Sequence, residues 1–157
     1  MYEPGIVIRR PLPEEAEELA GLIIRFYRFN EEFDPAWSVI RDAEDKAREV
    51  AKSYIEGNGF TLVATSGERL VGYLHAITRE YPMLEKSVQA VITELYVLPT
   101  HRGKGIATKL VEEAIKELAK QGVGVVTSEF PTANFVAEKF YKSRGFRPYT
   151  SIYLKEV

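Results

Sequence analysis

The sequence predicts an α/β fold in which a mixed, twisted β-sheet is flanked by about four helices. The chain has 157 residues, a length that fits one domain spanning 1–157. Its composition, with 45% hydrophobic and 28% charged residues, is that of an ordinary globular protein. Along the chain, the spacing of apolar residues switches between the two-residue period of strands and the longer period of helices. These observations give the element order β-α-α-β-β-β-α-β-α-β, with room for a second strand at the end.

The first part of the chain is predicted to form one strand and two helices. Ile6–Arg9 is a short strand, and the prolines after it stop the strand and start a helix at its first turn. Acidic residues in that turn suit the positive end of the helix dipole, and apolar residues at helical spacing carry the helix to about Tyr27. After a loop over Phe29–Pro35, one apolar stripe predicts a second helix that ends near Gly57: Ala43, Ala47, Val50, Ala51 and Tyr54.

From Phe60 onward, the pattern predicts a strand-rich region with two further helices. A turn at Ser66–Gly67 joins the first two strands, and Gly122 and Gly145 end the two helices. The predicted strands are Phe60–Thr65, Leu70–Thr78, Val88–Leu98 and Val123–Ser128, with one or two more within Phe146–Lys155, and the predicted helices are Lys104–Lys120 and Ala133–Ser143.

Composition and charge exclude several classes of protein. The 21 Lys and Arg nearly balance the 23 Asp and Glu, and the net charge of -2 argues against a dedicated nucleic-acid binder. The absence of cysteine excludes thiol nucleophiles and cysteine-based zinc sites, and with only two histidines we expect no metal site. Met1–Pro13 lacks the apolar core of a signal peptide, and no apolar run is long enough to predict a membrane span. We therefore expect a cytoplasmic protein, and its richness in Glu, Lys and Arg is typical of heat-adapted proteins.

The segment Val91–Ala107 carries the strongest chemical signal, because a predicted strand leads through a loop with two glycines into a helix. Gly103 and Gly105 allow the backbone to approach a ligand closely. The first amides of the helix, together with its dipole, suit a pyrophosphate. The residues Arg102–Ala107 match the motif R/Q-x-x-G-x-G/A at every fixed position, although alone such a match is equally compatible with a simple turn.

Two other phosphate motifs fit this loop less well. A nucleotide P-loop is excluded because Gly105 stands where its Ser or Thr belongs. A dinucleotide fingerprint lacks its third small residue at Thr108, although Glu129 lies at a suitable distance downstream. A nucleotide-dependent oxidoreductase is further disfavoured because the sequence predicts no second β-α-β half.

A second motif lies in the region of the last helix. The residues that match N-x-x-A-x-x-x-Y-x-x-x-G-F, in order, are Asn134, Ala137, Tyr141, Gly145 and Phe146. With the loop motif and the two helices after the first strand, this motif makes the chain resemble the GNAT N-acetyltransferase superfamily. The resemblance covers roughly the whole chain, and it implies the GNAT fold, a single N-acetyltransferase domain and acetyl-CoA as co-substrate.

The resemblance also implies how acetyl-CoA is held. In this family the loop amides bind its pyrophosphate, which carries over to Arg102, Gly103, Lys104, Gly105, Ile106, Ala107 and Thr108. The pantetheine arm is implied to pair like an added strand with Leu95, Tyr96 and Val97, next to a β-bulge. Asn134 matches the family asparagine that lies near the arm.

Glu94 is the candidate general base. Strand alternation predicts that it shares a face with Ile92 and Tyr96, where an unpaired carboxylate is costly to bury. Partial burial raises a carboxyl pKa toward the range suited to taking a proton from an ammonium group, directly or through water. The alternative is a solvated or salt-bridged glutamate near a sheet edge.

Tyr141 is, by its motif position, the candidate general acid that protonates the departing CoA thiolate or donates a hydrogen bond to its sulfur. The alternative is a tyrosine that packs the last helix on the sheet, as we expect of Phe140. Without cysteine no acetyl-cysteine intermediate forms, so we expect direct transfer to a primary amine in a ternary complex. Backbone N–H groups near Tyr96 or Val97 are placed to stabilise the oxyanion.

The sequence says least about the acceptor substrate and the oligomeric state. The amine is a small molecule, a peptide N-terminus or a lysine, and the protein a monomer or a homodimer. By resemblance, the loop Phe29–Trp37 borders the acceptor, and its Glu31, Glu32 and Asp34 favour a cationic amine. The alternatives are a solvated surface loop and, for the whole protein, a non-catalytic acyl-CoA-binding module that regulates a partner.

Overall fold

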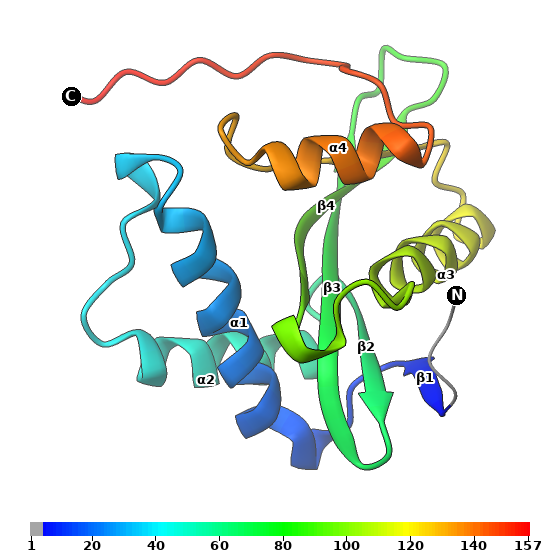
Figure 1. The fold of residues 1–157 in the computed structure, drawn as a ribbon. Helices are drawn as coiled ribbons and strands as arrows, with labels where there is room; N and C mark the ends of the chain where they lie inside the picture. The colour runs from blue at the N-terminus through cyan, green and yellow to red at the C-terminus, as the bar shows by residue number, and fades with distance from the viewer. Residues whose placement is uncertain (1–4) are drawn as a thin grey trace.

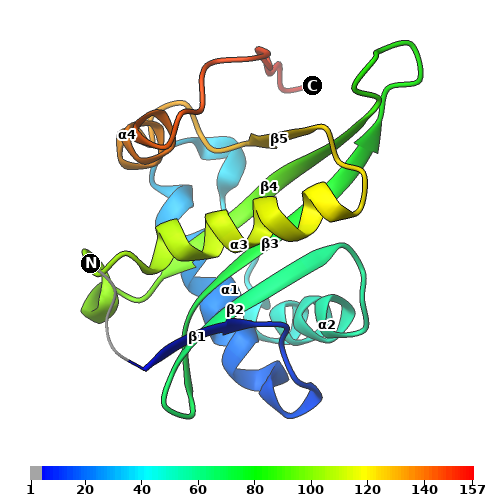
Figure 2. The same ribbon diagram turned by 90° about the vertical axis from the view of Figure 1, so that its right-hand side faces the viewer.

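The computed structural model describes residues 5–157, which form a five-stranded sheet with α1 and α2 on one face and α3 on the other (Figure 1, Figure 2). In sheet order the strands are β1 (Ile6–Arg9), β2 (Phe60–Ser66), β3 (Arg69–Glu80), β4 (Val88–Val97) and β5 (Val125–Ser128). The helices are α1 (Ala16–Glu31), α2 (Ala43–Ile55), α3 (Ile106–Lys120) and α4 (Phe135–Ser143), with 3-10 turns at Pro13–Glu15, Pro35–Trp37 and Pro99–His101. The sheet is antiparallel from β1 to β4, and β5 runs parallel to β4. The predicted mixed α/β class is confirmed.

The strands predicted within Phe146–Lys155 are wrong. After α4, residues 146–157 contain no strand, and residues 147–157 are exposed. Figure 1 shows this segment leaving α4 and running along an extended path away from the sheet. The segment has the apolar content of a strand, but its backbone pairs with no strand of the described chain.

The two faces of the sheet pack against different kinds of core. On the α3 side, Leu110, Ala114 and Leu118 pack with buried strand residues and Tyr141 of α4 in a hydrophobic cluster. On the other side, the buried stripe of α1 packs with Ala47 and Ala51 of α2. Buried polar side chains, among them His75 and Glu94, also lie on this side, so reactive groups are present between the sheet and the first two helices.

A β-bulge in β4 decides which face Glu94 occupies. His75 of β3 pairs with Glu94, whereas the next residue, Ala76, pairs with Ile92, so that Thr93 is skipped. The extra residue inverts the alternation of side chains beyond it. Ile92 therefore packs in the α3-side core while Tyr96 packs against α1 and α2. The expectation that Glu94 shares a face with Ile92 is thus wrong, and a bulge is present slightly before the expected position.

Candidate active site

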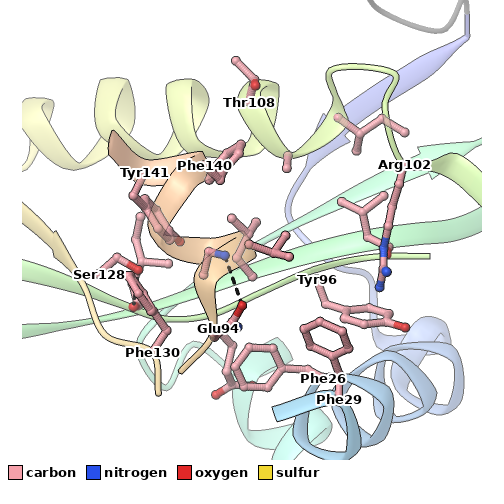
Figure 3. A pocket seen from close by; sticks show the side chains of 18 of the residues that line it. Phe26, Phe29, Glu94, Tyr96, Arg102, Thr108, Ser128, Phe130, Phe140 and Tyr141 are labelled. Atoms are coloured by element: carbon pink, nitrogen blue, oxygen red, sulfur yellow. Dashed lines mark hydrogen bonds between the residues drawn. The ribbon is translucent and has the colours of Figure 1, made fainter. Parts of the chain in front are cut away.

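A cleft opens where β4 and β5 part. Their pairing covers Gln89–Ile92 and Val125–Ser128, and within residues 5–157 β4 continues to Val97 with no strand on its β5 side. A cavity of about 530 Å³ occupies this opening, between the end of β4, the start of α3, α1 and α4. Figure 3 looks into it, with Tyr141 and Phe130 on one side of Glu94 and with Phe26, Phe29 and Tyr96 on the other.

The structure brings almost all of the predicted site residues to this one cavity. The predicted residues that line it are Glu94, Leu95, Tyr96, Val97, Arg102, Gly103, Gly105, Ile106, Ala107, Thr108, Asn134 and Tyr141. Lys104 is the predicted residue that does not belong to the lining. The lining residues that the sequence did not indicate include Phe26, Phe29 and Asn30 of α1 and Arg144 after α4.

The glycine loop forms one end of the cavity, and its geometry suits an anion. Gly103 and Gly105 have φ angles of +76° and +78°, a left-handed conformation that disfavours residues with a Cβ atom. Gly105 is the N-cap of α3, and no side chain caps the helix there, so its first amides keep their donors for a ligand. With the helix dipole, this geometry suits a pyrophosphate.

Two arginines flank the glycine loop. The Nε of Arg102 donates to the Val97 carbonyl at 2.9 Å, and its guanidinium lies 5.2 Å from the ring centre of Tyr96. On the opposite wall, the Nε of Arg144 donates to the Thr108 hydroxyl at 2.9 Å, and its guanidinium lies over the ring of Phe140. Both positive charges are therefore held at the mouth of the cavity by contacts within the chain.

Glu94 is held by three tyrosine hydroxyls. Tyr73 of β3 donates to Oε1 at 2.8 Å, while Tyr54 of α2 and Tyr27 of α1 donate to Oε2, the latter at 3.5 Å. Glu94 is only 3% exposed and has no cationic partner among the contacts that hold it. The alternative of a solvated or salt-bridged surface glutamate does not fit this geometry.

Burial controls the ionisation of this cluster. Desolvation raises the pKa of Glu94 above its ordinary 4.5, although the three tyrosine hydrogen bonds oppose the rise. Desolvation and the adjacent carboxylate raise the pKa of Tyr54, so that its hydroxyl stays a donor. His75 stacks on Tyr54 with ring centres 3.5 Å apart, and burial lowers its pKa to about 4. The histidine is therefore neutral at physiological pH. Its Nδ1 forms a hydrogen bond with the Thr61 hydroxyl at 2.8 Å.

Tyr141 lies on the wall opposite α1. Its ring stacks on Phe130 with centres 5.6 Å apart and meets Phe140 and Phe146 edge-on. Burial raises the pKa of Tyr141 to about 12, and a hydrogen bond with Ser128 opposes that rise. The residue is both packed and part of the cavity lining, so packing and a role in the reaction are compatible.

A pair of buried asparagines bridges the cleft. Asn134 caps α4 by accepting from the Ala137 amide at 3.1 Å, and its Nδ2 donates to Oδ1 of Asn30 on α1 at 3.0 Å. Asn30 in turn donates to the Phe26 carbonyl at 2.9 Å. The pair fixes α1 against the start of α4. The sequence pattern placed Asn30 in a loop over Phe29–Pro35, whereas α1 continues to Glu31 and carries Asn30 among its buried residues.

The segment predicted to border the acceptor, Phe29–Trp37, reaches the cavity only at its start. Phe29 and Asn30, which belong to the end of α1, line the cavity, whereas Glu31, Glu32 and Asp34 do not. Glu31 accepts from the Val39 amide at 2.9 Å, and Asp34 caps the next turn by accepting from the Ala36 amide at 2.8 Å. Two of the three predicted carboxylates thus stabilise the loop itself.

Two general features complete the description of residues 5–157. None of the helices described combines the length and the apolar character needed to cross a membrane. Nor does the described part of the chain gather three His, Asp or Glu side chains into a group that could hold a metal ion.

Comparison with known proteins identifies related sequences. The model of the acetyltransferase (GNAT) family matches residues 25–146. An uncharacterized N-acetyltransferase of Archaeoglobus fulgidus is 26% identical over 140 residues, which cover 89% of this chain and 92% of the relative. N-acetyltransferase 8B of Rattus norvegicus is 36% identical over 102 residues, but the match covers 63% of this chain and only 45% of that protein.

Solved structures show the same fold at low sequence identity. The BH1408 protein from Bacillus halodurans, in a tetramutant form, superposes with a TM-score of 0.82 at 18% identity, covering 96% of this chain and 99% of that one. The aminoglycoside N-acetyltransferase AAC(6')-Iy in complex with CoA gives a TM-score of 0.75 at 16% identity, with 97% of this chain and 94% of that one covered.

Proposed function

The chain belongs to the acetyltransferase (GNAT) family and is an acetyltransferase, and we propose that it moves the acetyl group of acetyl-CoA to a primary amine by direct attack in a ternary complex. The observation that carries this proposal is the position of Glu94. A buried carboxylate without a cationic partner among its contacts lies in the same cavity as an anion-binding glycine loop. A base and a site for a phosphorylated donor are thus within one cleft.

The donor end fits acetyl-CoA. The amides of Gly103–Thr108 suit its pyrophosphate, and the charges of Arg102 and Arg144 favour an anionic ligand. The edge of β4 over Leu95–Val97 suits the amide groups of a pantetheine arm. The Val97 carbonyl already accepts from Arg102, so Leu95 and the Val97 amide are the backbone groups left for that pairing. AAC(6')-Iy, a structural neighbour, was solved with CoA bound.

Glu94 is proposed to remove the proton of the acceptor amine. A carboxylate offers about four acceptor positions, of which the three tyrosines take three, so Oε1 keeps one for the amine or for a water between them. The raised pKa brings Glu94 closer to the working range of a general base. The tyrosines orient the carboxylate and delocalise its charge.

Tyr141 is proposed to serve the leaving group. The amine nitrogen attacks the thioester carbon to form a tetrahedral intermediate, which collapses as the carbon–sulfur bond breaks and the nitrogen releases its second proton. The thiolate takes a proton from the Tyr141 hydroxyl, which the proton released by the nitrogen then restores through solvent, or it is stabilised by a hydrogen bond from that hydroxyl. The raised pKa keeps the hydroxyl protonated at neutral pH. An N–H of the backbone near Tyr96 or Val97 is proposed to stabilise the oxyanion.

The acceptor is proposed to be a small amine, a peptide N-terminus or a lysine side chain. Two of these classes appear in the names of similar proteins, which include an N-alpha-acetyltransferase 30 of Schizosaccharomyces pombe among the relatives and an aminoglycoside N-acetyltransferase among the structural neighbours. In this chain the acceptor end of the cavity is formed by Phe26, Phe29 and Phe130 around Glu94. Aromatic faces beside one carboxylate favour a cation or an alkylamine over a phosphorylated sugar.

A screen of amines and peptides with acetyl-CoA, following the release of free thiol, tests the proposal. We expect amine-dependent thiol release by the wild type, and its loss in Glu94→Gln with acetyl-CoA affinity retained. Lys116→Gln, on α3 outside the cavity lining, is the control variant and should keep full activity. Acetyl-CoA binding without turnover for any acceptor would instead support the non-catalytic regulatory module.

A further inference from the structure

A row of three polar residues crosses the sheet on the side of α2. Thr61 of β2 pairs with His75 of β3, and His75 pairs with Glu94 of β4. All three side chains are buried. A buried polar group that lacks a hydrogen bond destabilises the fold, so such groups are kept where they have partners and a use. Glu94 is the candidate base, and its two neighbours in the row need a separate explanation.

The His75 ring makes two different contacts at once. Its flat face stacks on Tyr54 of α2, with ring centres 3.5 Å apart and ring planes 6° from parallel. Its edge carries Nδ1, which forms the hydrogen bond with the Thr61 hydroxyl at 2.8 Å. A phenylalanine ring would supply the face but not the hydrogen bond, and an aliphatic side chain would supply neither. Histidine is therefore the residue type that suits both neighbours.

Gly59, just before β2, leaves the space that this ring occupies. A Cβ atom at Gly59 would lie 2.6 Å from Cε1 and 2.8 Å from Nε2 of His75, closer than such atoms approach in proteins. The φ of Gly59 is +78°, which also disfavours a residue with a side chain. The imidazole is thus enclosed by Gly59, Thr61 and Tyr54 and is held in one orientation.

Tyr54 connects this ring to the base. Its hydroxyl donates to Oε2 of Glu94. Tyr54 stands in the last turn of α2, which ends at Ile55, and the residues that follow the helix are exposed. Helix ends open more readily than helix centres, so the position of the Tyr54 ring depends on the side chains against which it packs. The stack on His75 supplies a rigid surface at this point.

We propose that His75 is a positioning residue for the base, and that it acts by holding the Tyr54 hydroxyl against Glu94. His75 does not belong to the lining of the cavity, so its route to the reaction runs through Tyr54. Burial keeps the imidazole neutral, so it adds no counter-charge beside the carboxylate. The inference rests on the proposed function in one respect, the role of Glu94 as the base.

A double-mutant cycle on kcat tests the route. Tyr54→Phe removes one hydrogen bond to the carboxylate and should lower kcat about 10-fold, and His75→Leu should lower it about 5-fold. If His75 acts through the Tyr54 hydroxyl, His75→Leu should change kcat less than about 2-fold in the Tyr54→Phe background. Tyr73→Phe is the matched control background, because Tyr73 also donates to Glu94. There His75→Leu should still cost about 5-fold.

The fold is checked in parallel. Circular dichroism during heating shows whether each variant is folded at the assay temperature, and calorimetry should give an unchanged Kd for acetyl-CoA. If His75→Leu does not fold, His75→Asn takes its place, since its amide can keep the bond to Thr61 but lacks the ring face. Equal losses of kcat in the Tyr54→Phe and Tyr73→Phe backgrounds would mean that His75 serves the core in general, and the proposal would be overturned.

The ionisation of Glu94 gives a readout that needs no turnover. The ionisable groups that face the carboxylate are Tyr27 of α1, Tyr54 of α2, and Tyr73 and His75 of β3. The hydrogen bond from Tyr54 lowers the pKa of Glu94, so its loss should raise that pKa. We expect carbon-13 NMR of the carboxyl group, assigned with Glu94→Gln, to show a rise of about 1 pH unit in Tyr54→Phe. His75→Leu should give a smaller rise, and none in the Tyr54→Phe background.

The two readouts separate this inference from the proposed function. If Glu94→Gln keeps full kcat, the failure lies with the assignment of the base, and the NMR cycle still decides whether His75 holds Tyr54 on Glu94. A rise in the pKa of Glu94 that persists in full when His75→Leu is added to Tyr54→Phe would mean that the imidazole acts on the carboxylate directly. That result, or no rise in His75→Leu alone, overturns the positioning role.

Discussion

The donor end and the base end of the cleft are built in different ways. The donor end is local in sequence, because one strand, one loop and the first turn of one helix supply it, chiefly through backbone groups. The base end is assembled by side chains, since Tyr27, Tyr54 and Tyr73 reach Glu94 across separations of 67, 40 and 21 residues. Substitutions at the donor end should therefore change the affinity for acetyl-CoA, and those at the base end should change turnover and its pH dependence.

The largest effect should come from Glu94→Gln. The amide keeps the size of the side chain but cannot take a proton, so kcat should fall about 100- to 10,000-fold, the range of general base catalysis. The Kd of acetyl-CoA, measured by calorimetry, should change little. If the Kd of acetyl-CoA rose by the same factor as kcat fell, Glu94 would contribute to donor binding as well as to turnover, and the two ends of the cleft would not act independently.

The pH profile of kcat sharpens this prediction. Glu94 accepts a proton only when ionised, so activity should fall as the pH drops through its pKa, which burial places above 4.5. Above that pKa the carboxylate is charged and kcat should level off. The residual kcat of Glu94→Gln should not show this fall at low pH. If kcat of the variant still falls with the same midpoint pH, the fall is caused by the ionisation of another group.

Tyr141→Phe should have the next largest effect. It removes one hydroxyl and little volume, so stacking on Phe130 should persist. If the hydroxyl serves the thiolate, kcat should fall about 10- to 1000-fold with acetyl-CoA affinity nearly unchanged. Phe140→Leu is the packing control, because it disturbs the same cluster and leaves the hydroxyl in place. A larger loss of kcat in Phe140→Leu than in Tyr141→Phe would indicate that Tyr141 packs the helix on the sheet and takes no part in the reaction.

The same contrast explains what the sequence could predict. The glycine loop and the helix motif are each short stretches of sequence, so their residue spacing was enough to predict the loop residues and Tyr141, which line one cavity. The tyrosines around Glu94 are scattered among α1, α2 and β3, and nothing in their local sequence distinguishes them from core residues. Single-strand alternation also placed Glu94 on the face of Ile92, because the bulge at Thr93 follows from pairing with β3 rather than from β4 alone.

The failure at the C-terminus has a related cause. Residues 150–154 have strand propensity, but a strand needs an edge to pair with, and the described chain places this segment away from its own sheet. The order of the elements along the chain from β1 to α4 was predictable because apolar periodicity distinguishes strands from helices. Asn30 was missed because its partner Asn134 lies 104 residues away.

Gly105→Val should weaken the donor end selectively. Valine is strained at a φ of +78°, and its side chain would occupy the surface where the pyrophosphate is expected. We expect at least about a 10-fold rise in the Kd of acetyl-CoA, equivalent to about 1.4 kcal/mol. Gly122→Val is the matched control, since Gly122 has a φ of +88° and open space around it but lies at the far end of α3. If both variants lose stability equally and both keep acetyl-CoA affinity, the loop does not bind the donor.

The smallest effect should come from the acidic loop, which belongs to neither end of the cleft. Glu31 and Asp34 are held by backbone amides, so their replacement would disturb the loop as well as its charge. Glu32 is exposed, and Glu32→Gln changes the charge with little change of shape. At a distance, one exposed charge in water changes the local concentration of a cation only slightly, so KM for a cationic acceptor should rise about 2-fold at low salt. The difference should vanish at 0.5 M salt, where screening acts within a few ångströms, and KM for acetyl-CoA should stay the same. A rise that persists at high salt would mean that Glu32 contacts the acceptor directly, and a rise of equal size with a neutral acceptor would mean that the loop acts through its shape rather than its charge.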